Sequence, residues 1–349
     1  MKKFLTGLTP FMFAFLLLAC DSHVSPSVAS NEASSQTVSS EADSQEISDQ
    51  GSSSNTVVPT ALSAGADVRG YSFSPASEYD LRDVDSISKE LFTTLTFNES
   101  TMFPTEEHMP SDLSPDELMK IGMDPGLGVR ELHEQGITGK HVNVAIIDQP
   151  LMSHHPEFDR RIVKLFNLVN DPKSRESMYG PVVTSLFVGK TVGTAPEANV
   201  YYASVPAWLE DGAYEAKALD WILSENASLP ADRKIRVVAV ARSMDGEHIK
   251  NASAWQESKQ RAADAGILVL DYGDDRLTSA AYFDCFDRDN FEKLSCGFPD
   301  QKIWSDKTGS YLFVPTSYRT VAEQLDGYEG YSYWGVGAEN WTVPYTAGV

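Results

Sequence analysis

A short apolar run that ends on a carboxylate is the feature that most constrains the fold of this chain. Residues 142–147 are rich in valine and isoleucine and are followed directly by Asp148. Apolar runs that barely alternate are typical of strands that crossover helices bury on both faces of a parallel sheet. Ligands of such sheets bind outside the carboxyl ends of the strands, so Asp148 is a candidate site residue. Taken alone, it is better explained as a structural acid that caps the next loop.

The rest of the chain alternates between strand and helix patterns. Further strands are expected within 158–168 and at 199–205, 235–241 and 267–270, and helices at 114–135, 180–190, 214–225 and 252–265. A last strand is expected at 311–314, and a final helix starts at residue 341. Strands that alternate with helices of this length predict an α/β fold with a right-handed parallel sheet.

The N-terminus has the pattern of an export signal. Residues 1–19 begin with two lysines and continue into a short apolar run, which is too short to span a bilayer as a mature helix. The string Leu17-Leu18-Ala19-Cys20 resembles a bacterial lipobox, after which Cys20 would be lipidated. We therefore expect an exported lipoprotein at a bacterial membrane surface. The alternative is an ordinary signal peptide with an incidental cysteine.

The next two segments do not read as domains. Residues 20–65 are rich in serine and contain several acidic residues but no lysine or arginine. Such a segment cannot bury enough apolar surface to fold, which predicts a disordered acidic linker. Residues 66–124 are polar with two short apolar patches and no clear period, and are interpreted as a lead-in to the folded domain.

Charge and cysteine content narrow the possible partners. The formal net charge of −22, without any basic cluster in the sequence, argues against binding of nucleic acid or anionic lipid. Cys285 and Cys296 form a disulfide or remain reduced and buried, and their spacing is not that of a zinc site. No motif indicates a cofactor or a metal, and a monomer is expected.

Four sequence blocks together resemble the subtilisin-like serine peptidases, or subtilases. They are GITGKHVNVAIIDQP at 136–150, YGPVVTSLFVGKTVGTAPEANVYYASV at 179–205, IRVVAVARSMDG at 235–246 and GAENWTVPYTAGV at 337–349. The resemblance covers about residues 125–349, in the family's order. It implies a three-layer subtilisin-like fold with a parallel central sheet, and a peptidase domain at 125–349 that is incomplete at its C-terminus.

The resemblance places Asp148 at the position of the triad aspartate, Tyr179 at that of the histidine and Asn340 at that of the serine nucleophile. The family's mechanism needs a base to take the serine proton and a hydroxyl to attack the carbonyl. A phenol is protonated at neutral pH and an amide is not a nucleophile, so two of the three groups are missing. The buried Asp148 carboxylate still needs donors, and we expect the Tyr179 hydroxyl to supply one.

The resemblance also assigns a substrate-binding role to Arg242, Ser243 and Met244, which follow the strand that lines the family's cleft. Where the family usually has an oxyanion-hole asparagine after the strand at 267–270, this chain has Asp271, whose charge would repel an oxyanion. The nearby candidates for catalytic rescue are His154 and His155 in the loop after Asp148, and Ser185 and Ser243; the histidines read as structural and neither serine has a base beside it.

These observations favour an inactive subtilase relative, a pseudoprotease that retains at most the binding of a peptide or protein. An active serine endopeptidase with relocated catalytic groups is the first alternative, and a non-functional product of a decaying gene is the second.

Overall fold

The computed structural model describes the ranges 62–69, 80–151, 154–169, 178–244, 246–272, 288–289, 314–325 and 328–349, all within the compact unit Ser54–Val349. The expected signal peptide, Cys20, most of the acidic linker, Cys285 and Cys296 lie outside the described residues. Across the described part of the chain, every helix is too short or too polar to span a membrane.

A five-stranded parallel sheet forms the centre of the fold. Its strands are β2 (Asn143–Asp148), β3 (Ile162–Asn167), β4 (Asn199–Ser204), β5 (Ile235–Val240) and β6 (Leu268–Asp271), in the spatial order β3-β4-β2-β5-β6. The strand that carries Asp148 pairs with β4 on one side and β5 on the other, and all six of its residues are buried. This confirms the parallel α/β sheet and the buried strand at 142–147 that the sequence predicted.

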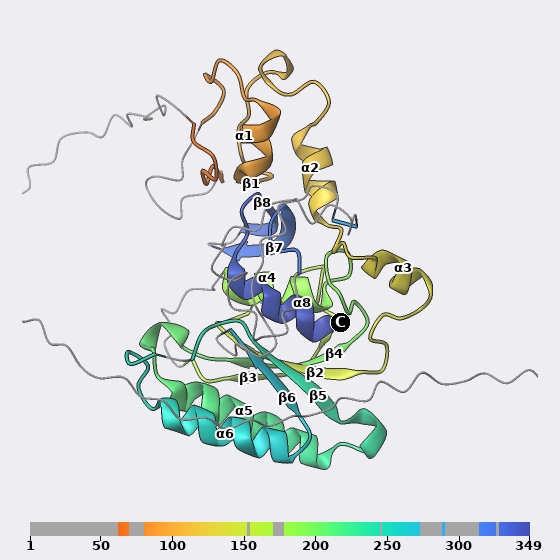
Figure 1. Cartoon of the computed structure of the whole chain (residues 1–349), viewed down its shortest axis with the longest axis vertical. Coiled ribbons are helices and arrows are strands. Elements are labelled where there is room, and N and C mark those ends of the chain that lie inside the picture. Colours follow the sequence, from red (N-terminus) through yellow and green to blue (C-terminus); the bar gives the residue numbers. More distant parts are fainter. Residues whose placement is uncertain are drawn as a thin grey trace, which may run out of the picture. The chain divides into compact units, whose positions relative to one another are not determined.

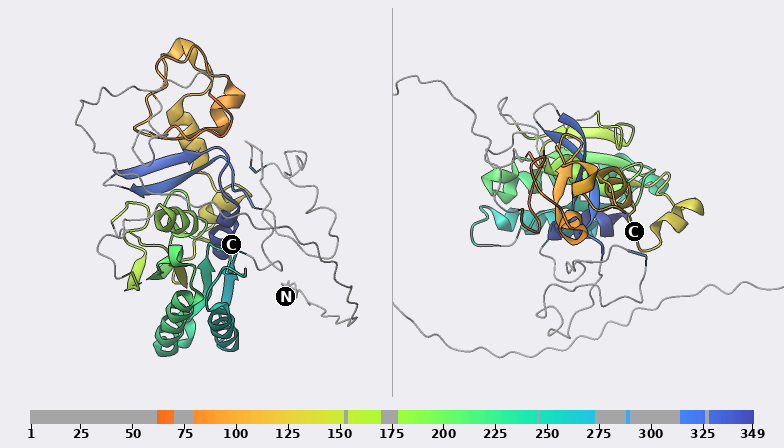
Figure 2. Two further views of the ribbon diagram at one scale, coloured as in Figure 1. Left: turned by 90° about the vertical axis from the view of Figure 1, so that its left-hand side faces the viewer. Right: turned by 90° about the horizontal axis from the view of Figure 1, so that it is seen from above.

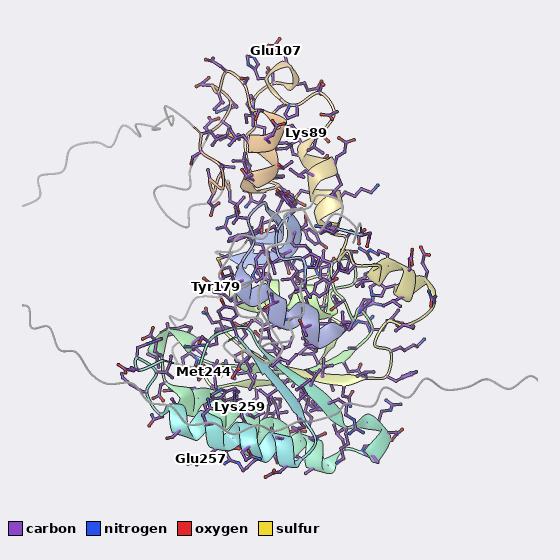
Figure 3. The ribbon with its side chains drawn as sticks, in the orientation of Figure 1. Lys89, Glu107, Tyr179, Met244, Glu257 and Lys259 are labelled. Carbon is purple, nitrogen blue, oxygen red and sulfur yellow. The ribbon has the colours of Figure 1, made fainter. Side chains whose placement is uncertain are left out.

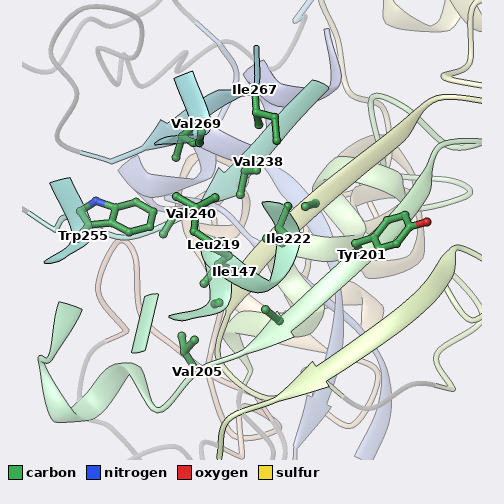
Figure 4. Packing of buried hydrophobic residues seen from close by; sticks show 14 of the residues in the cluster. Ile147, Tyr201, Val205, Leu219, Ile222, Val238, Val240, Trp255, Ile267 and Val269 are labelled. Atoms are coloured by element: carbon green, nitrogen blue, oxygen red, sulfur yellow. The ribbon is translucent and has the colours of Figure 1, made fainter. Parts of the chain in front are cut away.

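Helices cover both faces of this sheet (Figure 1). On one face lie α5 (Gly212–Ser228) and α6 (Ala252–Asp264), which pack side by side (Figure 2). They bury Leu219, Ile222 and Trp255 against β2 and β5 in the core shown in Figure 4. On the other face lie α4 (Tyr179–Val188) and α8 (Thr342–Gly348). Nine of the ten residues of α4 are buried, which is the pattern of a helix covered all round. The three layers confirm the predicted fold class.

Shorter elements connect these layers. The helical pattern at 114–135 forms two helices, α2 (Pro115–Gly122) and α3 (Val129–Glu134), separated by a glycine-containing turn. Ser114 is the N-cap of α2 and forms a capping box with Glu117, and Pro115 is the first helical residue. Single 3-10 turns occur at η2 (Ala207–Leu209), η3 (Ala231–Arg233) and η4 (Glu339–Trp341).

The expected strand at 311–314 is wrong in its described part. Val314 is buried but belongs to no strand, and the strand of this region, β7 (Arg319–Leu325), begins five residues later. It forms an antiparallel hairpin with β8 (Tyr328–Trp334). A strand that is covered on both faces does not alternate between polar and apolar residues. The short apolar run at 311–314 therefore did not predict the position of this hairpin.

The segment 66–124 packs against this hairpin. It contains α1 (Lys89–Thr94), β1 (Thr96–Asn98) and η1 (Glu106–His108), and β1 adds to β8 to make a second sheet in the order β1-β8-β7. A cluster of aromatic rings fills the interface, with the ring centroids of Phe97 and Tyr333 5.1 Å apart and those of Phe92 and Phe97 5.7 Å apart. Residues separated by more than 200 positions thus share one small core, which no local pattern in the sequence predicts.

A buried ion pair also joins this segment to the hairpin. The Arg69 Nη1 atom lies 2.5 Å from the Glu323 Oε1 atom, and both side chains are almost fully buried. Arg69 also contacts Asp67, and its guanidinium lies 4.6 Å from the ring centroid of Trp334. Removal of one partner of such a pair leaves an uncompensated buried charge.

We therefore expect Glu323→Ala to lower the free energy of unfolding by about 3 kcal/mol, because it removes the buried carboxylate of the pair and leaves the buried Arg69 with only the partly exposed Asp67 as a charged partner. Urea denaturation followed by far-UV circular dichroism would measure this. The matched control is Arg82→Ala, which removes the exposed ion pair with Asp80 and should change little. Equal stabilities of the two variants would contradict the structural role of the buried pair.

Candidate active site

The candidate site lies at the carboxyl edge of the central sheet, where Asp148 ends β2. Its side chain is 8% exposed, and its Oδ1 atom accepts a hydrogen bond of 2.7 Å from the Gln149 N–H. The neighbouring strand β4 ends in register with it at Ser204, and the Val205 N–H donates to the Asp148 carbonyl. The position of Asp148 therefore follows directly from the strand pairing of β2.

Burial dominates the electrostatics of Asp148. It raises the pKa of the carboxyl from its ordinary value of 3.8 to about 7, although the Gln149 N–H and the positive charge of Arg242 lower it. The nearby Glu215 carboxyl raises it further. At neutral pH a substantial fraction of Asp148 is thus protonated, unlike an aspartate that must stay ionised to stabilise a cationic partner.

Tyr179 is the first residue of α4, where Figure 3 labels it, and its side chain is 44% exposed. The helix begins next to the loop that follows Asp148, because Gly180 allows a close approach. A Cβ atom at Gly180 would lie 2.7 Å from the Pro150 oxygen and 2.9 Å from the Gln149 oxygen. Only glycine fits this contact. The predicted hydrogen bond from Tyr179 to Asp148 stays a prediction.

A second tyrosine, which no sequence pattern singles out, lies close to this carboxyl. Tyr202 on β4 is completely buried, and its hydroxyl donates a 2.6 Å hydrogen bond to the Gln149 carbonyl. Burial raises its pKa well above the ordinary value, and the neighbouring Asp148 raises it further. The signal that could have found it is the register of adjacent parallel strands, because Tyr202 lies opposite Ile146, two residues before Asp148.

Asn340 lies in η4, before α8, at the same edge of the sheet. Its Nδ2 atom donates a 2.7 Å hydrogen bond to the Ala241 carbonyl, immediately after β5. The preceding residue, Glu339, accepts a hydrogen bond from the Tyr272 hydroxyl just after β6. The amide of Asn340 therefore ties the start of α8 to the end of β5.

The residues after β5 are also held by internal contacts. The Arg242 Nη1 atom donates to the Ala207 carbonyl at 2.9 Å and to the Glu215 Oε1 atom at 2.8 Å. Met244 is 1% exposed and packs in the core beneath α5 and α6, and Figure 3 labels its position. The substrate-binding role of Arg242, Ser243 and Met244 stays a prediction, and the side chain of Met244 is covered by the core.

Asp271 ends β6. The resemblance places the family's oxyanion-hole asparagine just after this strand. The Asp271 carboxylate is 1% exposed and accepts hydrogen bonds from the Trp255 Nε1 atom at 2.9 Å and the Lys259 Nζ atom at 3.0 Å, both on α6. The carboxylate is thus an acceptor for donors of the helix layer. It supplies no donor for a developing oxyanion.

His155 and Ser185, two of the four residues considered for catalytic rescue, are held by internal contacts. His155 is completely buried, its Nδ1 atom accepts from the Glu157 N–H at 3.2 Å, and its Nε2 atom contacts the Gly330 carbonyl of β8 at 2.8 Å. Ser185 is buried within α4, donates to the Val182 carbonyl and accepts from the Ala322 N–H. Both side chains therefore hold structural elements together. His154 is exposed.

Among the described residues, no group of three or more His, Cys, Asp or Glu side chains is arranged to hold a metal ion. The side chains that the fold gathers at this sheet edge are Asp148 from β2, Arg242 after β5, Asp271 from β6, Tyr179 from α4 and Asn340 before α8.

Comparison with known proteins agrees with the resemblance. No family model matches the chain. A stretch of 146 residues is 23% identical to the subtilase-type proteinase RRT12 of Saccharomyces cerevisiae, and it covers 42% of this chain and 28% of the yeast protein. The chain thus matches less than a third of the length of that relative.

Two of the solved structures to which the chain is similar are a cold-adapted subtilisin-like serine proteinase and the PatG macrocyclase domain. A cold-adapted subtilisin-like serine proteinase is 20% identical with a TM-score of 0.39, and covers 60% of this chain and 74% of its own. The PatG macrocyclase domain is 13% identical with a TM-score of 0.43, and covers 63% of this chain and 79% of its own. The sequence match to the yeast proteinase agrees with the four sequence blocks, so this chain is similar to a subtilase-type proteinase over part of its length.

The raised pKa of Asp148 makes the stability of the fold depend on pH. The folded pKa of about 7 exceeds the ordinary value of 3.8, so the folded state keeps the proton while the unfolded state loses it. Stability is therefore highest below the unfolded pKa, falls as the pH rises through this window, and levels off above the folded pKa.

Asp148→Asn should remove this decline, because the amide keeps an acceptor for the Gln149 N–H without the buried charge. We expect the variant to be more stable than the wild type near pH 8 by about 2–4 kcal/mol, and to differ less near pH 4. Urea denaturation at several pH values would measure it. The control Asp159→Asn makes the same chemical change at an exposed position and should leave the pH dependence intact.

Proposed function

We propose that this chain is an exported, lipid-anchored subtilase relative that lacks peptidase activity and binds an extended peptide at the former cleft. The observation that carries the proposal is the presence of Tyr179 and Asn340 at two of the three triad positions. Neither group can replace the imidazole or the serine hydroxyl. In a related template, loss of the serine or the histidine alone lowers kcat by about a million-fold.

The contacts of the site support this proposal. Asn340 donates to the Ala241 carbonyl and Arg242 is held by Glu215 and Ala207, so both side chains have structural partners. Asp148 is buried with a pKa raised to about 7, and an acid that is partly neutral is a weaker partner for an imidazolium. These features suit a scaffold whose catalytic requirements have been lost.

Exposed aromatic side chains at the same edge favour peptide binding as the remaining activity. Tyr179 is 44% exposed, and Trp208 in η2 is 48% exposed, three residues after the backbone contact between Val205 and Asp148. Aromatic side chains supply large contact areas at low entropic cost and are enriched in binding surfaces. A protein or peptide ligand is therefore the partner class that we propose.

The test of inactivity uses the full chain with a fluorophosphonate probe and a casein substrate. We expect neither labelling nor turnover, because Tyr179 and Asn340 stand at the positions of the catalytic histidine and serine. Any signal should be challenged with Ser243→Ala and Ser185→Ala. A signal that one of these substitutions abolishes would establish a relocated nucleophile and overturn the proposal.

Peptide binding is tested separately, with immobilised casein peptides and Trp208→Ala. Loss of the exposed indole should weaken binding by about tenfold without a change in the circular dichroism spectrum. Leu209→Ala, at the adjacent exposed position, is a milder control. Unchanged binding by the Trp208 variant would exclude this edge of the sheet as the binding surface.

The proposed membrane anchor rests on the lipobox-like string that ends at Cys20. In a bacterial host given labelled palmitate, the full chain should incorporate label and fractionate with membranes. Cys20→Ala should abolish both. Membrane fractionation that persists in this variant would contradict anchoring through Cys20.

A further inference from the structure

The strand β3 forms one margin of the central sheet (Figure 1). It pairs with β4 on its inner side, and within the described ranges no strand pairs with its outer side. An open strand edge presents backbone donors and acceptors to which another extended chain can pair. Proteins usually protect such edges with charged side chains, bulges or covering segments.

The direction of the backbone groups of β3 follows from its pairing. The Leu168 N–H donates to the Ser204 carbonyl of β4 at 2.9 Å. In a parallel ladder, alternate residues direct both backbone groups to the same neighbour, so Phe166 and Lys164 face β4. The N–H and carbonyl groups of Leu165 consequently face outward, whereas the register of β3 shifts between Ile162 and Lys164 and the regular alternation does not extend to Val163. The two backbone groups of Leu165 are the ones that the edge offers to an added strand.

The side chains along this edge are unusually apolar. Val163 is 49% exposed and Leu165 is 48% exposed, and residues two apart on a strand lie on the same face of the sheet. The intervening lysine does not protect the edge, because its Nζ atom is 2.5 Å from the Glu225 Oε2 atom on α5. The edge therefore offers two adjacent apolar contacts together with open backbone groups.

Three basic side chains gather at the start of the same strand. Arg160 and Arg161 immediately precede β3, and with Lys190 they line a hollow of about 370 Å³. None of the three forms an ion pair with another described residue. The hollow also contains Asp159 and Glu157, and the Glu157 carboxylate is already engaged by the Tyr331 hydroxyl and the Thr191 N–H.

We propose that the outer edge of β3 binds an extended peptide as an added strand, with apolar side chains against Val163 and Leu165 and a carboxylate among Arg160, Arg161 and Lys190. Main-chain hydrogen bonds provide affinity in this mode of recognition, and side-chain contacts provide specificity. A second copy of this chain is a poorer occupant, because its own edge segment 160–167 contains no carboxylate to meet the three basic groups.

The charge of the whole chain does not prevent this recognition. The net charge of −22 repels acidic ligands at long range, but the screening length at physiological ionic strength is about 8 Å. Within that distance the two guanidinium groups and the ammonium group determine the local field. They favour a carboxylate, for which arginine can provide two parallel hydrogen bonds.

The binding test uses the full chain and two fluorescent hexapeptides that differ in one residue. The probe is acetyl-Glu-Val-Thr-Val-Thr-Val-amide, and the matched peptide carries Lys in place of Glu. Fluorescence anisotropy should show about tenfold tighter binding of the acidic peptide. The double substitution Arg160→Glu with Arg161→Glu should abolish this preference, whereas Lys217→Glu on α5 should preserve it. No binding, or a preference unaffected by the double substitution, would overturn the proposal.

Backbone pairing is tested with a proline. Leu165→Pro removes an outward N–H without breaking the hydrogen bonds of β3 to β4, and edge strands tolerate proline at such positions. Leu165→Pro should weaken the binding of the acidic peptide by at least about tenfold. Leu165→Thr keeps the N–H and should retain more of the affinity. Circular dichroism checks that both variants fold. Equal affinity of the two folded variants would exclude strand addition, and concentration-dependent self-association that Leu165→Pro abolishes would replace the peptide with a second copy.

Discussion

The position of β2 between β4 and β5 is the constraint on which the rest of the site depends. A paired strand on each side and helices on both faces bury the whole strand, including the carboxylate that ends it. The loop after Asp148 can then accept only a glycine at the start of α4, since Gly180 lies against two of its carbonyls. The end of β5 in turn provides the carbonyl that orients Asn340. A buried strand thus fixes the positions of all three groups.

Several polar groups at this edge form hydrogen bonds within the protein. Arg242 joins Glu215 to the Ala207 carbonyl, and Asp271 accepts from two side chains of α6. Such internal hydrogen bonds stabilise the scaffold, because an unpaired buried polar group would destabilise it. The same partners reduce what each side chain can offer to a reaction. A scaffold that is intact around missing catalytic groups is what the proposed loss of activity requires.

The second sheet depends on contacts between distant parts of the chain. The strand β1 pairs with β8, and Arg69 pairs with Glu323 across 254 positions of sequence. Closing so long a loop has an entropic penalty that grows only slowly with length, so the burial of Phe97 and Tyr333 can offset it. The segment 66–124 and the hairpin therefore stabilise each other, and neither has a complete core by itself.

The sequence by itself determined the parallel α/β sheet, most of its strands and helices, and the identities of the residues that the resemblance places at the three triad positions. These follow from local patterns, since buried parallel strands are continuously apolar and the four sequence blocks carry their own order. Only the tertiary structure decided that β1 joins the hairpin, that Tyr202 lies near Asp148, and that basic residues from different loops meet beside β3. Each of these depends on strand register or loop geometry, which places side chains together without any trace in sequence spacing. The pKa of Asp148 belongs to the same class, because burial is a property of the neighbours and not of the residue.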